Sequence, residues 1–234
     1  MQAIDHHQYD IEKETVVNRK MLGERIPARL NGIYRLLVEN RQGFEQWRLA
    51  LTIDLVQSVG RNCGELLETI GKDRLPAAAW IARNLLELLV WVKYCGVSKE
   101  NAWRFHEDAL RDVKGLTELH KQICDVIGIE DESSTIAAQL IKDEASKLGL
   151  EDIDSIFLAV AKASKEPGVD LDRQFVAINK SLSKFAHPTA GLVHGITHQA
   201  EVCRHLQAVC TTQGMCFAEQ STLTVEALLG VAAE

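Results

Sequence analysis

Apolar residues recur at intervals of three and four along most of this chain, which is the spacing of one face of an α-helix. The run over residues 43–71 shows it most clearly, with apolar positions at Phe44, Trp47, Leu51, Leu55, Val59, Leu66 and Ile70. No window combines clean alternation with β-branched residues, and no repeat of 20–50 residues is present. We therefore predict an all-α, single-domain helical bundle.

Helix start and stop signals divide the chain further. We expect helices over residues 11–40, with a kink or break at Pro27, and over 43–71, 75–95, 99–126, 135–148, 153–165, 171–186, 190–213 and 224–229. Ser98 and either Asp170 or Asp172 are the expected N-caps. Residues 1–42 are expected to form an N-terminal helical extension, and residues 43–234 the bundle domain.

Two of these helices have expected places in the bundle. The segment 75–95 is apolar nearly all round, which predicts a central helix. The segment 99–126 is amphipathic, and its apolar residues are expected to face the core: Trp103, Leu110, Val113, Leu116 and Ile123.

Composition narrows the class of protein. The chain is 46% hydrophobic and 25% charged, as in ordinary globular domains. Its net charge of −7 excludes a broadly basic protein that coats nucleic acid. Residues 1–19 are polar, and the apolar stretch 75–92 is interrupted by charges, so we expect neither export nor a membrane span. Six cysteines without a C-x-x-C pair are expected to be reduced and mostly buried, in a cytoplasmic protein.

Polar residues inside the apolar segment 75–95 are the first candidate site. Arg83 and Glu87 are four residues apart and therefore share one helical face, with Asn84 beside them. Because buried charges are costly unless paired, this is either a structural ion pair or a group that lines a pocket.

A second candidate site surrounds His187, which a following proline places at a helix end. Histidine readily exchanges protons near neutral pH, and Lys180 and Lys184 one and two turns earlier could hold a phosphate, with Ser183 nearby. The alternative is a capping histidine with solvated lysines.

A third set has the spacing of metal ligands on one face of a continuous helix: His194, His198, Glu201 and His205. One straight helix cannot surround an ion, so the alternative is a polar outer face or a dimer contact. His194 is also a candidate second histidine of the His187 site. The chain lacks a phosphate loop, a dinucleotide fingerprint, an H-E-x-x-H motif and a G-x-S-x-G motif, and we expect no cofactor.

Two of these segments carry a resemblance. The Ala-Arg-x-x-x-Glu segment at 82–87 and the Leu-Ser-Lys-Phe-Ala-His-Pro-Thr segment at 182–189 resemble a bacterial all-helical family of unknown function, itself similar to the HEPN superfamily. That resemblance implies a helical bundle that often dimerises, and many members are metal-independent ribonucleases of toxin and phage-defence systems. His187 matches the family's histidine, whereas Lys180-Ser181 stands where the family has arginine and a polar residue.

These observations leave three hypotheses. The first is a regulatory or partner-binding component of a bacterial defence or toxin–antitoxin system, with an RNA or protein partner, acting as a homodimer. The second is a metal-independent RNase with His187 as general acid/base and with Lys180, Lys184 and Arg83 as phosphate contacts. The third is a metal site on the histidine-rich face. The first two require Arg83 and His187 to meet at a shared polar crevice between packed helices.

Overall fold

The computed structural model describes residues 11–39, 45–130, 132–147, 158–194 and 199–230, and the described part is helical without a strand. The prediction of an all-α bundle is confirmed. The elements are α1 (Ile11–Lys20), a π-helical turn (Met21–Arg25), α2 (Ile26–Glu39), α3 (Gln46–Thr69), α4 (Leu75–Val97), α5 (Lys99–Ile127), α6 (Glu132–Lys147), α7 (Val160–Ala163), α8 (Asp172–Ala186), α9 (Ala190–His194) and α10 (Ala200–Leu228).

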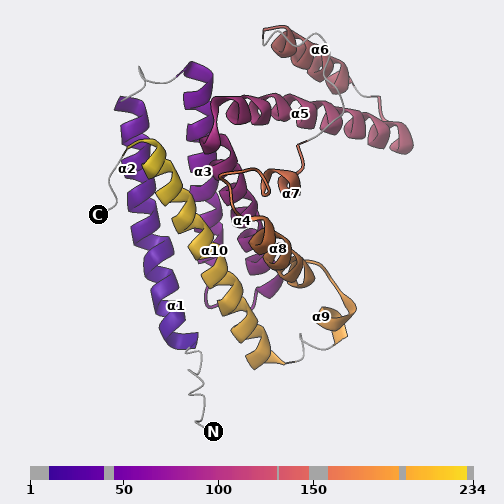
Figure 1. The fold of residues 1–234 in the computed structure, drawn as a ribbon. Helices are drawn as coiled ribbons and strands as arrows, with labels where there is room; N and C mark the ends of the chain where they lie inside the picture. Colours follow the sequence, from indigo (N-terminus) through magenta and orange to yellow (C-terminus); the bar gives the residue numbers. More distant parts are fainter. Residues whose placement is uncertain (1–10, 40–44, 131, 148–157, 195–198, 231–234) are drawn as a thin grey trace.

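Helix α4 is the centre of the bundle, as its all-round apolarity predicts. It packs against α3, α5, α7, α8 and α10, and α10 covers it along much of its length (Figure 1). At 23 residues α4 is longer than the apolar stretch expected over 75–92, and by length and composition alone it would suffice to cross a bilayer. Its burial among neighbouring helices accounts for that composition.

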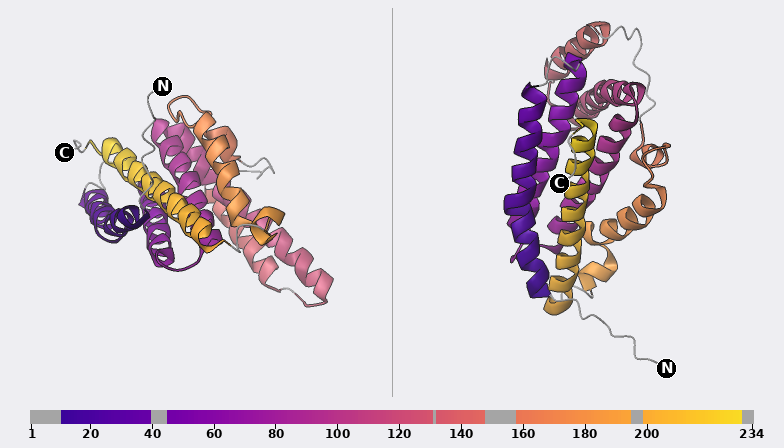
Figure 2. Two further views of the ribbon diagram at one scale, coloured as in Figure 1. Left: turned by 90° about the horizontal axis from the view of Figure 1, so that it is seen from below. Right: turned by 60° about the vertical axis from the view of Figure 1, so that its left-hand side comes forward.

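The N-terminal segment packs into the same core. Residues from the π-turn and α2 join the buried cluster formed by α3, α4, α8 and α10, namely Leu22, Ile26, Leu30, Ile33 and Leu37. The expected break at Pro27 appears as the π-turn just before it, where the Ile26 N–H donates to the Met21 carbonyl five residues back. Figure 2 shows α1 and α2 lying beside α10, and the Arg29 Nε–Glu226 Oε1 ion pair of 3.0 Å joins α2 to α10.

Helix ends follow the expected signals in most places. The Ser98 hydroxyl accepts a 3.1 Å hydrogen bond from the Asn101 N–H and caps α5. Gly71 and Gly128 have φ of 79° and 72°, which glycine adopts without strain, and they follow the ends of α3 and α5. The expected carboxylate cap of α8 is wrong, because Leu171 is the N-cap and no side chain caps the helix.

Helix boundaries after residue 147 depart from expectation. The helix expected over 153–165 is reduced to α7 among the described residues, since Leu158 and Ala159 are not helical. The continuous helix expected over 190–213 is wrong: α9 ends at His194, and Gln199 has a non-helical ψ of 81° before α10 begins. The separate helix expected over 224–229 is also wrong, because α10 runs unbroken to Leu228.

Gly214 explains why α10 can run so close to α4. A Cβ at this position would lie 2.7 Å from Leu66 Cδ2 and 3.2 Å from both Cα and Cβ of Ala82. The absence of a side chain therefore sets the separation of the two central helices, which outweighs the low helix propensity of glycine.

We expect Gly214→Ala to lower the free energy of unfolding by about 1–2 kcal/mol, because overpacking exceeds the gain in helix propensity. The matched control is Gly64→Ala on α3, where a Cβ meets nothing within 4 Å. That variant should gain about 0.5–1 kcal/mol. Urea unfolding followed by circular dichroism measures both, and a stabilised Gly214→Ala would contradict the close-approach argument.

None of the six cysteines forms a disulfide, and four of them are buried, as expected. Desolvation by burial raises the pKa of Cys63, Cys95 and Cys210 to about 12. Because thiolates and not thiols are nucleophilic, these three side chains serve packing rather than chemistry.

The prediction that fails most clearly is the orientation of α5. Val113, Leu116 and Ile123 were expected to face the core, yet their exposed fractions are 46%, 66% and 57%. The reason is that only the first part of α5 lies against the bundle, while the rest extends away from it with α6 folded back on it (Figure 1). Trp103, by contrast, does pack against the bundle, with its ring centroid 5.0 Å from that of Trp47 on α3.

Candidate functional site

Helix α8 is held on α4 by its apolar face. Phe175 and Leu182 are buried among residues of the core, and the Lys93 ammonium on α4 donates a 3.4 Å hydrogen bond to the Val169 carbonyl just before α8. The opposite face of α8 is polar, which is the pattern of an amphipathic surface helix. This packing brings the end of α8 to the first turns of α4.

An exposed tryptophan lies at that junction. Trp80 on α4 is 47% exposed, and the centroid of its ring lies 6.1 Å from that of the His187 imidazole in an edge-to-face arrangement. The guanidinium carbon of Arg83 lies 5.9 Å from the centroid of the same indole. At this distance a cation interacts favourably with the face of an aromatic ring. We call Trp80, Arg83, Glu87 and His187 the Trp80 surface.

The expected Arg83–Glu87 ion pair is present at this surface. Arg83 Nε donates to Glu87 Oε1 over 3.1 Å, and both side chains are about one-quarter exposed. Helical spacing places the half-buried Asn84 on the same side of α4 as this pair. Since the pair is only partly buried, it orients the guanidinium over Trp80 at a modest cost in desolvation.

His187 ends α8 through its backbone. Its N–H donates to the Ser183 carbonyl over 3.3 Å, and its carbonyl accepts from the Thr189 N–H over 2.7 Å. Its imidazole is exposed and makes no hydrogen bond to the residues that the structure describes. The capping role expected for this ring is therefore taken by the main chain.

The other expected residues of α8 lie on the face that leads to His187. Lys180 and Lys184 are exposed. The Ser183 hydroxyl donates to the Asn179 carbonyl over 2.7 Å, so its proton is already used within the helix. Lys180 and Lys184 therefore place two cations on the face of α8 that leads to the Trp80 surface.

The structure therefore brings Arg83 and His187 to one surface, where each contacts the same indole. Sequence reasoning missed Trp80, the residue that joins them, because an aromatic residue in an apolar helix reads as core. The signal was its position: Trp80 precedes Arg83 by three residues and Glu87 by seven, which places it on the polar side of α4.

The metal hypothesis loses its geometric basis. His198 and the side chain of His194 lie outside the described residues, and the break before Ala200 removes the continuous helix that was to align the four ligands. Glu201 is exposed and His205 half-buried on α10. Among the described residues, no group of three His, Cys, Asp or Glu side chains could hold a metal ion.

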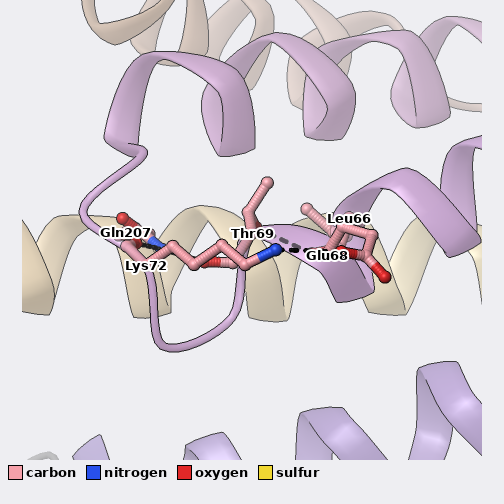
Figure 3. A network of polar contacts seen from close by, with 5 residues as sticks. All are labelled: Leu66, Glu68, Thr69, Lys72 and Gln207. Carbon is pink, nitrogen blue, oxygen red and sulfur yellow. Dashed lines mark hydrogen bonds and ion pairs between the residues drawn. The ribbon is translucent and has the colours of Figure 1, made fainter.

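A second polar region, unforeseen from the sequence, surrounds the turn between α3 and α4. The buried Gln207 side chain on α10 donates to the carbonyls of Thr69 and Lys72, each over 2.7 Å (Figure 3). Its amide oxygen accepts from the Arg74 N–H over 2.8 Å. One side chain thus adds three hydrogen bonds to a turn whose own backbone bonds run from the Lys72 N–H to the Thr69 carbonyl and from the Arg74 N–H to the Lys72 carbonyl.

A cleft of about 280 Å³ opens beside this turn. Its lining includes Asn18, Gly71, Arg204 and Gln207. Asn18 is 1% exposed and donates to the Thr212 hydroxyl over 2.9 Å, while its amide oxygen has no partner among the described residues. The cleft is roomy enough for water molecules that satisfy this oxygen.

Comparisons with known proteins add no family to this picture. The sequence matches no protein-family model and no curated protein, and the structure matches no solved structure.

Proposed function

We propose that the protein is a regulatory, partner-binding helical module that docks another protein on the Trp80 surface. The observation that carries the proposal is the half-exposed indole of Trp80, contacted by a guanidinium and an imidazole from two different helices. Tryptophan and arginine are the residues most enriched at the energetic centres of protein interfaces. A partner that covers the exposed apolar ring would also gain free energy, because the ring is removed from water on binding.

The charges around Trp80 favour a protein partner over RNA. Arg83 is paired with Glu87, so its charge is largely neutralised before any ligand arrives. Two further cations, Lys180 and Lys184, lie on the face of α8 that leads to Trp80. The chain as a whole carries a net charge of −7. Affinity for RNA comes mainly from cations that displace counterions from phosphates, which requires a strongly basic surface.

The wider setting belongs to the same proposal. A HEPN-like architecture and a role in a bacterial defence or toxin–antitoxin system rest on the resemblance of the segments that contain Arg83 and His187. The proposed cytoplasmic location rests on the polar N-terminal residues and on cysteines without a C-x-x-C pair. The alternative, a metal-independent RNase, has one supporting observation: the exposed imidazole of His187 shares a face of α8 with Lys180 and Lys184. In that alternative His187 is the general acid/base and the cations hold the phosphate.

The test starts from capture of the partner. The tagged 234-residue chain is cross-linked in its own cells, the captured protein is identified and purified, and binding is measured by calorimetry. We expect Trp80→Ala to weaken binding at least about thirtyfold, as at the centre of an interface. The matched control is Tyr34→Ala on α2, a similarly exposed aromatic residue at 44%, which should change affinity less than about twofold.

Two outcomes would overturn the proposal. One is a Trp80→Ala variant that binds the captured protein as tightly as the wild type while remaining folded. The other is cleavage of single-stranded RNA by the purified wild type that is lost in His187→Ala, which would establish the RNase alternative.

A further inference from the structure

We propose that α5 and α6 form a self-association arm through which two copies of this chain dimerise. The two helices extend from the bundle as a hairpin, and α6 packs mainly on α5 (Figures 1 and 2). Large aliphatic side chains on this hairpin are exposed by 56–86%: Leu116, Leu119, Ile123, Val126, Ile127, Ile136 and Leu140. We call these seven residues the arm face.

The arm face is continuous across both helices. Helix α5 turns the buried Cys124 toward α6, and α6 turns the buried Ile141 toward α5. On each helix an exposed residue directly precedes the buried one, Ile123 on α5 and Leu140 on α6, and is rotated by about 100° in the same sense. In an antiparallel hairpin the same sense of rotation leads to the same side, so the exposed residues of α5 and α6 form one surface.

The spacing on α5 specifies a helical partner. Leu116, Leu119, Ile123 and Val126 follow intervals of three, four and three, which is the seam of a coiled coil. The complement of such a seam is another helix with the same spacing, and this chain supplies one in its own second copy.

The absence of charge on that seam favours self-association over a different partner. In a two-fold dimer each patch meets its own copy, so a charged residue on the patch would face a like charge. The line from Leu116 to Val126 on α5 carries no charged side chain. On α6 the face with Ile136 and Leu140 continues into Glu144 and Lys147, which pair with each other over 2.9 Å.

The exposed area matches what a stable dimer requires. A fully exposed Leu, Ile or Val side chain presents on the order of 100 Å² of apolar surface, so the arm face presents about 450 Å². A standard interface buries about 800 Å² on each partner, of which about 450–520 Å² is apolar. A monomer would have to leave the whole of this surface in water.

The arm lies at the far end of α4 from Trp80 (Figure 1). Pairing of two arms therefore leaves the Trp80 surface of each copy open, and the inference does not depend on the proposed function. The resulting dimer would present two separate Trp80 surfaces, one on each copy.

Sedimentation velocity of the 234-residue chain tests the inference. We expect a mass twice the 26.1 kDa of one chain at micromolar concentration. The double variant Leu119→Lys/Ile123→Lys should raise the dissociation constant of the dimer at least about a hundredfold. The reason is that the two added lysines of one copy would face the same two lysines of the other. The control is Val16→Lys/Val176→Lys, which adds the same charge at positions of similar exposure, 67% and 52%, on α1 and α8.

Circular dichroism checks that each variant keeps its helices. If the lysine pair lowers helix content, the milder Leu119→Ser/Ile123→Ser pair decides in its place. The inference is overturned by a wild type that is monomeric at 100 μM, because this concentration is about a hundred times a micromolar dissociation constant. It is equally overturned by a folded arm variant that stays dimeric, or by a control that dissociates as readily.

Discussion

Phe175→Ala is expected to lower the free energy of unfolding by about 3–5 kcal/mol. Phe175 is 2% exposed and is the largest fully buried side chain of the described core. It is also the aromatic anchor of α8, the helix that carries Lys180, Ser183, Lys184 and His187. Its loss removes the transfer free energy of the ring and leaves a cavity between α8 and α4 that neighbouring side chains fill only in part.

The neighbouring residue provides the control for this experiment. Val176 lies on the outer face of α8 with 52% exposure, so Val176→Ala should change stability by less than about 0.5 kcal/mol. Phe175→Leu, which keeps most of the volume, should cost about 1–1.5 kcal/mol. Urea unfolding gives all three values, and a Phe175→Ala variant no less stable than Val176→Ala would mean that α8 is not anchored by this ring.

The same substitution links stability to the candidate site. Because α8 presents His187 to Trp80, loosening α8 should separate the imidazole from the indole before the whole bundle unfolds. Hydrogen exchange should therefore rise in α8 first in Phe175→Ala, while the amides of α4 remain protected. This order distinguishes a positioning role for Phe175 from a general contribution to the core.

Helix content and most helix ends could be predicted because the signals are local. Apolar spacing of three and four defines α3, and Ser98 begins α5 by a contact only three residues away. Gly71 and Gly128 end their helices through their own backbone conformation. Each of these features depends on neighbours in the chain, which the sequence displays directly.

What could not be predicted depends on which neighbour covers a face. The apolar residues of α5 have the same spacing whether a core or a second molecule covers them, so Leu116 and Ile123 were assigned to the core. Trp80 was hidden in the same way, as an aromatic residue in an otherwise buried helix. The sequence did not show that α10 continues through Gly214. Glycine is favoured there because Ala82 of α4 lies close to it, and that contact is not visible in the local sequence.

Gln207 is the clearest case of information absent from local pattern. It is one of many polar residues on α10, and the three backbone groups that it contacts lie more than 130 residues earlier in the chain. No side-chain pattern encodes a partner that is a backbone carbonyl in a turn. The Gln207 network therefore emerges only when α10 is placed beside the α3–α4 turn (Figure 3).

Gln207→Ala is expected to lower the free energy of unfolding by about 3 kcal/mol, because it removes three hydrogen bonds worth about 1 kcal/mol each. The turn then keeps only its backbone hydrogen bonds, from the Lys72 N–H to the Thr69 carbonyl and from the Arg74 N–H to the Lys72 carbonyl. Gln207→Glu tests the donors separately. A carboxylate of the same shape can still accept from Arg74, but it cannot donate to either carbonyl and would repel both, so it should be at least as destabilising as alanine. The control is Gln213→Ala on the same helix, which should change stability by less than about 0.5 kcal/mol.

Hydrogen exchange decides whether this loss arises at the turn. If Gln207 stabilises the α3–α4 turn, the Arg74 amide should lose protection in Gln207→Ala more than amides in the middle of α4 do. An equal loss throughout α4 would mean that the side chain acts by filling space. A variant as stable as Gln213→Ala would mean that water replaces all three hydrogen bonds, which the adjoining 280 Å³ cleft makes a direct physical alternative.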